Sequence, residues 1–543
     1  MSTPERAVAA ARLSFVALLV GAALALLPYA SYLTDDTFIH FQFVKHLALG
    51  GGLSFNAGEP TYGMTSPLWT LLLAGLARLL HVPVAAPADA VSMPPIAWLA
   101  KACGALFHLL AIALLVRTGR RLGWSRGLSF ALGALLAAHA WAERWALSGM
   151  ETPLAVFCVV WAWLELAGTF AEGKGAVGAG VALGAAALAR PECHLLLLLA
   201  VVALALGADR GRRRAAQALL GSLLVLVPWL ITAWVSFHRL LPNTAAAKAG
   251  AWIHGGAALA ALRAELQIVL ATDALPLAFF VLVLALGGRA TALPRDRGRR
   301  AFWILNASWT LFLPLFLAAA GVQVVSRYLL LAVPSLLLLG TASFRWVVAT
   351  SFPGARRWAL PAFLAWFVAQ NAALTAFVSA PNAREHTTGL RFSLVALGLW
   401  ARHHTPPEAV FAVPDIGAFG YYAERRVVDL YGLVTPELAP IVVREGYDAV
   451  VTQVLYEVAG RPDYLIDRHP ERGRLARPTE EGTPYRFLFA RAIPNLGITR
   501  RRIYYYSVYA IDWGVVDRTR THVASLPLPK RGAIIEGRAL AAR

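Results

Sequence analysis

Long apolar runs separated by short clusters of arginine fill the first two thirds of the chain. The clearest runs approach or exceed the roughly 20 residues that a helix needs to cross a bilayer; they are residues 13–27, 96–116, 219–237 and 359–378. The pattern predicts a polytopic α-helical membrane protein with about eleven transmembrane helices. The predicted spans are residues 13–30, 96–116, 127–142, 152–170, 175–189, 193–208, 216–236, 274–288, 301–320, 328–347 and 358–379.

The arginine clusters predict the topology, because loops rich in Lys and Arg stay on the cytoplasmic side of a membrane. The clusters lie within residues 117–126, 210–214, 289–300 and 345–357. All four fall on one side only if residues 65–81 do not cross. We therefore expect an uncleaved first span that starts in the cytoplasm. Residues 31–95 then form a long external loop with re-entrant or interfacial helices, and the chain ends outside.

Residues 381–543 read differently from residues 1–380, because short strand signals replace the apolar runs. The predicted elements are a helix at 385–403 and strands at Val410–Val413, Val427–Leu430, Tyr485–Ala490 and Ile503–Ile511. These two ranges are the predicted domains, a transmembrane domain and a small soluble α/β domain on the periplasmic surface of a bacterial inner membrane. The bilayer itself is thus an expected partner.

The net charge of +19 raises the question of nucleic-acid binding. Residues 1–380 carry 28 Lys and Arg against 14 Asp and Glu, and residues 381–543 carry 22 against 17. The excess lies between apolar runs, as the positive-inside rule predicts, so nucleic acid is not an expected partner. Three cysteines provide neither a disulfide framework nor a zinc site, and we expect them to be apolar packing residues: Cys103, Cys158 and Cys193.

Two adjacent aspartates, Asp35 and Asp36, follow the first span directly. A charged group so close to hydrocarbon suggests function, although the pair could simply cap a helix at Thr37–Leu49. That helix mixes apolar residues with polar ones such as His40, so we expect it to lie in the headgroup plane. It would hold the aspartates at the depth of a lipid-linked phosphate.

Further polar motifs lie on later external loops of the predicted topology. Each residue alone has an ordinary explanation as a helix-end or loop residue, but one topology places carboxylates and cations on the same side. The candidates are Glu151, Arg190, Glu192, Asn243, Lys248, Arg327 and Tyr328. A carboxylate can take a proton from an acceptor hydroxyl, and a cation can stabilise a departing phosphate. The set therefore favours sugar transfer from a phosphate-linked donor.

Several motifs resemble the bacterial GT-C glycosyltransferases. Asp35–Ile39, Phe55–Pro60, Gly63–Trp69, Ser148–Pro153, Arg190–Glu192, Leu241–Thr244 with Lys248, Pro414–Gly420 and Val428–Leu433 carry the resemblance, which spans about residues 10–465. Together they look most like the branch of the mycobacterial terminal β-(1→2) arabinofuranosyltransferase.

The resemblance implies a GT-C fold with a cavity under the first external loop. It also implies a polyprenyl-phosphate sugar donor, decaprenyl-phosphate arabinofuranose in that branch, and an envelope glycan, lipid or protein as acceptor. Asp35 would be the base and Asp36 its partner, whereas Arg190, Lys248 and Arg327 are candidates for the donor phosphate from their charge and side. If the product keeps the anomeric configuration, Asp36 or another nucleophile would be needed.

Other interpretations stay open at this point. No cofactor is certain, but Asp35 and Asp36 could bind a divalent cation. The aromatic residues Tyr504, Tyr505, Tyr506 and Trp513 could stack on acceptor sugars or be ordinary core and surface residues. A transporter or flippase of lipid-linked sugars is the main alternative, and a non-catalytic envelope-assembly partner is another. Spans that we expect to be nearly free of buried charge favour an enzyme over a transporter.

Overall fold

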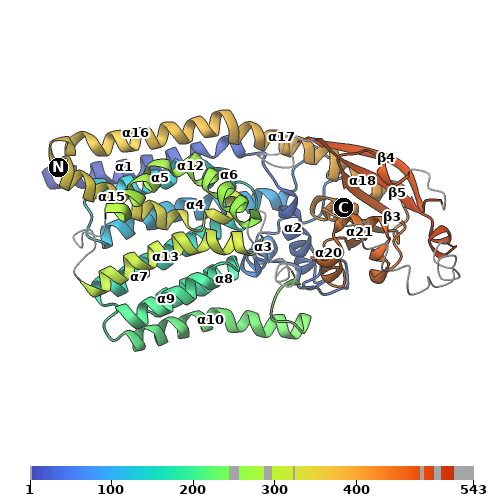
Figure 1. Cartoon of the computed structure of the whole chain (residues 1–543), viewed down its shortest axis with the longest axis horizontal. Helices are drawn as coiled ribbons and strands as arrows, with labels where there is room; N and C mark the ends of the chain where they lie inside the picture. Colours follow the sequence, from blue (N-terminus) through green and yellow to red (C-terminus); the bar gives the residue numbers. More distant parts are fainter. Residues whose placement is uncertain are drawn as a thin grey trace, which may run out of the picture.

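The computed structural model describes residues 3–243, 256–286, 296–321, 325–476, 482–494 and 503–518. A helical bundle forms one end of the elongated molecule and an α/β domain forms the other (Figure 1). The bundle helices are α1 (Thr3–Ala25), α4 (Pro95–Arg121), α5 (Arg126–Ala137), α6 (Ala140–Ala146), α7 (Thr152–Glu172), α8 (Val177–Ala189), α9 (Cys193–Gly207), α10 (Gly211–Phe237), α12 (Gly256–Leu286), α13 (Arg297–Ala319), α14 (Ser326–Leu329), α15 (Val333–Ser351) and α16 (Arg356–Leu374).

The apolar surface of the bundle is that of a multi-pass membrane protein. Within the described residues, eight helical segments are long and apolar enough to cross a bilayer. Three further predicted spans are helices, but α5, α8 and α9 contain only 12, 13 and 15 residues. At 1.5 Å per residue they reach about 18–23 Å, less than the roughly 30 Å of the hydrocarbon core. All eleven predicted spans thus overlap helices of the bundle, and complete crossings by these three stay a prediction.

Two of the arginine clusters lie at one end of the bundle. Helix α1 begins at the end farthest from the α/β domain, and the turns α9–α10 and α15–α16 lie at this same end (Figure 1). Arg210–Arg214 and Arg356–Arg357 occupy these turns. These two clusters therefore lie at the same end of the bundle, and the α/β domain lies at the opposite end (Figure 1).

The longest helical segment, Pro353–His404, joins the bundle to the α/β domain. Its 52 residues correspond to about 78 Å of helix, more than twice the thickness of the hydrocarbon core. It comprises α16, α17 (Ala380–Leu390) and α18 (Ala396–His404), joined by π-helical turns at Thr375–Ser379 and Arg391–Val395. Position 380, the predicted domain boundary, lies within this helical segment.

The α/β domain is built on a five-stranded sheet in the order β2-β1-β3-β5-β4. Its elements are β1 (Val410–Val413), α19 (Gly417–Ala423), β2 (Arg426–Asp429), α20 (Ala439–Glu445), α21 (Tyr447–Thr452), β3 (Tyr464–His469), β4 (Tyr485–Pro494) and β5 (Ile503–Ile511). β1 pairs in parallel with β2 and β3, whereas β5 pairs antiparallel with β3 and β4. Four strands were predicted, and the central strand β3 was missed.

Two helices of the loop after α1 lie where the bundle meets the α/β domain. α2 (Asp35–Ala48) packs against α3 (Pro67–Leu79) on one side and α19 on the other. Phe41 and Phe43 of α2 are fully buried. The amphipathic pattern of α2 therefore reflects burial between protein elements, and its position at the depth of the headgroups stays a prediction. α3 has 13 residues, too few to cross, as predicted.

Candidate active site

The aspartate pair occupies the first turn of α2. Thr34 is the N-cap and forms a capping box with Thr37, so neither aspartate is needed as the cap. Instead the Asp35 carboxylate accepts hydrogen bonds from the backbone N–H groups of Gly417 (3.1 Å) and Ala418 (2.7 Å) of the α/β domain. The first residue of α2 is thus fixed by the start of α19, nearly 400 residues away in the sequence.

The surroundings of Asp35 favour its protonated form. Burial raises the pKa of its carboxyl, and the negative charges of Asp415 and Asp36 raise it further, against the two backbone hydrogen bonds; the resulting pKa is about 8. A carboxyl group whose pKa lies near neutrality is suited to exchange a proton with a substrate. Asp35 can therefore gain or lose a proton close to neutral pH.

Asp36 points to a different partner, the guanidinium of Arg327 on α14. The distance from Asp36 Oδ2 to Arg327 Nη2 is 2.6 Å. The guanidinium also lies over the rings of Trp145 (5.5 Å) and Tyr328 (5.2 Å), a cation–π arrangement that holds its plane. Its Nε atom is buried without a hydrogen-bond partner in the part of the chain that the structure describes. Arg327 thus retains donor capacity for an anion.

A second ionic group, centred on Glu151, lies on the bundle side of the same site. One carboxylate oxygen is 2.6 Å from Arg190 Nη1, and the other is 3.3 Å from His40 Nε2. Burial alone would raise the pKa of Glu151, but the hydrogen bond with His40 and the charges of Arg190 and Arg327 together lower it. Glu151 is therefore ionised while Asp35 has a raised pKa, and only Asp35 is suited to proton exchange near neutral pH.

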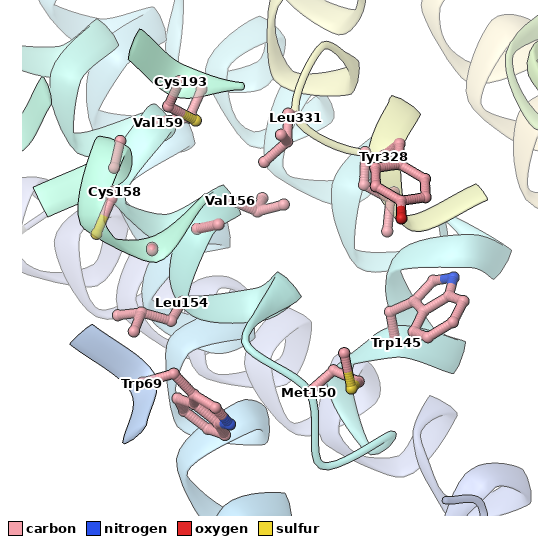
Figure 2. Close-up of a cluster of buried hydrophobic side chains, with 14 of the residues drawn as sticks. Trp69, Trp145, Met150, Leu154, Val156, Cys158, Val159, Cys193, Tyr328 and Leu331 are labelled. Carbon is pink, nitrogen blue, oxygen red and sulfur yellow. The ribbon is translucent and has the colours of Figure 1, made fainter. Parts of the chain in front are cut away.

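Arg190 forms ion pairs with two carboxylates, those of Glu151 and Glu192. Besides its contact with Glu151, its Nε and Nη2 atoms lie 3.1 and 2.9 Å from the Glu192 carboxylate. Its guanidinium also lies 4.6 Å from the centre of the Tyr328 ring, so this ring lies close to two arginines. Tyr328 and Trp145 lie at one edge of an apolar cluster that also contains Met150 (Figure 2). The cluster provides a low-dielectric wall for the charged groups.

The turn before α7 brings Glu151 close to α2. Gly149 has a φ of +77°, and a Cβ there would lie 2.6 Å from a methyl carbon of Thr37. The Thr37 hydroxyl donates to the carbonyl of Ser148 (2.8 Å), and the Trp69 indole donates to the carbonyl of Gly149 (3.1 Å). The glycine therefore allows the close approach that places Glu151 beside His40.

The structure brings most of the predicted site residues together, with two exceptions. Asn243 lies elsewhere: its side chain donates to the Leu433 carbonyl (3.0 Å) and to Thr61 (3.3 Å), joining the first loop to the α/β domain. Lys248 lies outside the described residues, so its role stays a prediction. The residues that do meet are Asp35, Asp36, His40, Glu151, Arg190, Glu192, Arg327 and Tyr328.

The aspartate pair does not form a metal site in this arrangement. Both Asp35 oxygens accept backbone hydrogen bonds, and Asp36 pairs with Arg327. Within the described ranges, no group of three or more His, Cys, Asp or Glu side chains is arranged to hold a metal ion. The contacts of the two carboxylates therefore do not fit a resident metal ion. The three cysteines are buried and free, as predicted.

Two groups of residues were not anticipated from the sequence. Asp415, whose charge acts on Asp35, belongs to a motif that was noted without a role; it accepts hydrogen bonds from Arg468 and Tyr506. The spans also hold more buried ionisable groups than expected: His139 and Asp273 lie 3.0 Å apart and are almost fully buried. The prediction of spans nearly free of buried charge was wrong, and one argument against a transporter is lost with it.

Comparison with known proteins supports the fold. ArnT from Cupriavidus metallidurans bound to undecaprenyl phosphate is 16% identical, with a TM-score of 0.58 over 91% of this chain and 97% of that chain. The Archaeoglobus fulgidus oligosaccharyltransferase tethered with an acceptor peptide is 12% identical, with a TM-score of 0.53 over 83% of this chain and 69% of that one. A third structure, the oligosaccharyltransferase AglB from Archaeoglobus fulgidus in complex with an inhibitory peptide and a dolichol-phosphate, is 12% identical, with a TM-score of 0.50 over 83% and 69%.

Sequence comparison adds less. Residues 381–521 match a family model described as a domain of unknown function, DUF8728. No curated protein matches the sequence. At these identities the structural likeness concerns the fold, and the chain has the predicted GT-C membrane fold with a small C-terminal sheet domain.

Proposed function

We propose that this protein is a membrane glycosyltransferase that moves a sugar from a polyprenyl phosphate to an envelope glycan, lipid or protein. The observation that carries the proposal is that two adjacent aspartates have different partners and different properties. Asp35 has a pKa suited to a base, while Asp36 lies 2.6 Å from an arginine suited to a phosphate. Base and anion site thus lie one residue apart.

In the proposed reaction, Asp35 takes the proton of an acceptor hydroxyl. The oxygen forms a bond to the anomeric carbon of the donor, and the bond from that carbon to the phosphate oxygen breaks. The polyprenyl phosphate leaves with the bonding electrons, and Arg327 stabilises the charge that develops on it. Arg327 is the better phosphate ligand because its Nε has no partner within the described residues, whereas Arg190 is held by Glu151 and Glu192.

The carrier, the sugar and the orientation are parts of the same proposal. The ArnT structure with the same fold holds undecaprenyl phosphate, which supports a polyprenyl carrier here. Arabinofuranose is proposed from the resemblance of the sequence motifs to one arabinofuranosyltransferase branch. The arginine-rich end of the bundle would face the cytoplasm of a bacterial inner membrane, so the site and the α/β domain would face the periplasm.

The test uses the full chain purified in detergent, with decaprenyl-phosphate arabinofuranose labelled in the sugar. The acceptor is the methyl glycoside of an arabinofuranosyl disaccharide, and the labelled product is separated by chromatography. Asp35→Asn should lower the transfer rate by about 10²–10⁴-fold, the usual contribution of a general base. Asp89→Asn is the matched control, because Asp89 is an exposed aspartate of the same loop whose hydrogen bonds within the described residues all go to its own turn, at Val91 and Ser92.

The outcomes separate the residue assignment from the function. Full activity in Asp35→Asn would remove Asp35 as the base. Absence of transfer by the wild-type protein, with the labelled lipid recovered intact, would contradict the glycosyltransferase. With the same protein reconstituted in vesicles, movement of that lipid across the bilayer without cleavage would instead support the transporter.

A further inference from the structure

A partly exposed tyrosine of the α/β domain, Tyr431, is joined to the Asp35 region through a short chain of polar contacts. Tyr431 follows β2 and is 37% exposed. Its ring stacks on Tyr447 with the centres 5.4 Å apart and an angle of 15° between the planes. Its hydroxyl accepts a hydrogen bond from Arg468 Nη2 (3.2 Å). These two contacts hold a large aromatic side chain in place at the surface, outside the hydrophobic core.

The loop that carries Tyr431 is built rigidly. The buried Asp429 carboxylate accepts hydrogen bonds from the backbone N–H groups of Tyr431 (2.9 Å) and Val434 (3.0 Å). Gly432 has a φ of +80°, and a Cβ there would lie 2.4 Å from the backbone nitrogen of Ala439. The buried Asp429 carboxylate thus fixes the backbone that carries the partly exposed Tyr431 ring. Such support from buried groups is a feature of pre-organised binding surfaces.

Tyr431 is connected to Asp35 through two further side chains. Arg468 Nη1 lies 2.8 Å from both oxygens of Asp415, and the buried Tyr506 donates to the same carboxylate (2.7 Å). Asp415 lies two residues before Gly417, which holds Asp35. The side chains of Arg468 and Asp415 are 25% and 21% exposed. The aromatic ring, the guanidinium and the carboxylate therefore form one partly open surface beside the base.

We propose that Tyr431, Arg468 and Asp415 form the acceptor subsite and bind a sugar ring of a saccharide acceptor. This inference rests on the proposed function. The apolar C–H face of a sugar can stack on an aromatic ring, while Arg and Asp provide donors and acceptors for neighbouring hydroxyl groups. A ring bound there presents one hydroxyl to Asp35, and such positioning is a large part of the rate enhancement in bimolecular transfer.

The subsite differs from the aromatic residues considered from the sequence alone. Tyr506 is 1% exposed and its hydroxyl donates a hydrogen bond to Asp415. It therefore positions Asp415, and its own ring is too buried to contact a sugar. The Trp513 indole donates to the Pro462 carbonyl, and Arg461 lies over its ring. Tyr431 also carries an arginine over its ring, with Arg468 5.9 Å from the ring centre, but its side chain is the most exposed of the three.

The first experiment measures binding without catalysis. Saturation-transfer NMR is recorded on the full-length Asp35→Asn protein in detergent, with the methyl glycoside of an arabinofuranosyl disaccharide and with methyl maltoside as probes. The starting protein should give signals for at least one probe. Tyr431→Ala in that background should reduce them at least fivefold, and Tyr431→Trp should restore them. The control is Phe392→Ala, which removes a 70% exposed aromatic ring of the helix before β1.

The second experiment separates acceptor from donor in the active enzyme. Tyr431→Ala should raise the KM for the acceptor at least tenfold and leave the KM for the polyprenyl-phosphate donor unchanged. An equal change in both KM values, no change in either, or no saturation transfer to either probe would overturn the subsite. Wild-type protein that binds a probe but transfers no sugar would contradict the proposed function instead.

Discussion

Two charged regions meet at the aspartate pair, and they differ in how open they are. On the bundle side, Glu151 and Arg190 are almost fully buried and paired. On the side of the α/β domain, Asp415 and Arg468 are also paired, but each is about a quarter exposed. The same chemical groups are therefore closed off in one region and accessible in the other.

The difference indicates separate tasks for the two regions. A buried ion pair contributes little net stability relative to apolar packing, yet it is costly to break, so it fixes geometry. A partly exposed pair is screened by water and can exchange one partner for a ligand at lower cost. We infer that the bundle supplies a rigid frame and that the α/β domain supplies the surface that meets the substrate.

The largest effect should come from breaking the closed region. Glu151→Gln leaves the buried Arg190 with Glu192 as its remaining carboxylate, and loss of one partner of a buried pair typically costs about 3–5 kcal/mol. The apparent Tm in detergent should fall by many degrees. Glu172→Gln is the control, because its pair with Arg121 is exposed and should be worth less than about 1 kcal/mol. Equal shifts for both variants would show that the closed network is not a structural frame.

A smaller but still large effect should follow from separating the two regions. A Cβ on Gly417 would lie 2.0 Å from the backbone oxygen of Asp35, so Gly417→Ala must displace α19 from α2 and loosen the Asp35 carboxylate. Misplacement of a catalytic group by about 1 Å can cost 10²-fold in rate. Transfer assays should therefore show a loss of this order.

Gly127→Ala provides the control for this variant, because a Cβ there meets nothing within 4 Å. Its transfer rate should match that of the wild-type protein. A normal rate in Gly417→Ala would mean that contact with the α/β domain does not position the base.

Much of the bundle could be predicted because the position of a membrane helix depends mainly on the order of apolar and charged residues along the chain. Apolar runs locate helices in a bilayer, and arginine clusters locate their ends. The missed strand β3 illustrates the limit. Asp467 in its middle is fully buried and paired with Arg474, 2.8 Å away, and a charged residue within a short apolar stretch reads as a loop until its partner is known.

The candidate site was predictable only on the bundle side, for a related reason. Asp35 follows the first span directly, and one topology placed Arg190 and Arg327 on its side of the membrane. The contacts of Asp35 with Gly417 and Ala418 join residues more than 380 positions apart. No spacing encodes such a contact, because it arises when two independently patterned domains pack together.

The smallest effect, and the most diagnostic for the comparison, concerns pH. The base must be deprotonated to act, so kcat/KM for the donor at saturating acceptor should rise with pH through about 8, the pKa of Asp35. Asp415→Asn removes a negative charge that raises this pKa. Asp35 would then lose its proton more easily, and the rising limb should move to lower pH by roughly 1 pH unit.

The direction of that shift distinguishes the two regions. Asp415 is part of the open region on the α/β domain. We therefore expect it to act on Asp35 through its charge, and not as part of the rigid frame of the bundle. A limb that moves to lower pH while the apparent Tm changes little would support this view. A large loss of Tm with an unmoved limb would instead place Asp415 with Glu151 as a structural residue, because removing a frame contact lowers stability without changing the proton affinity of the base.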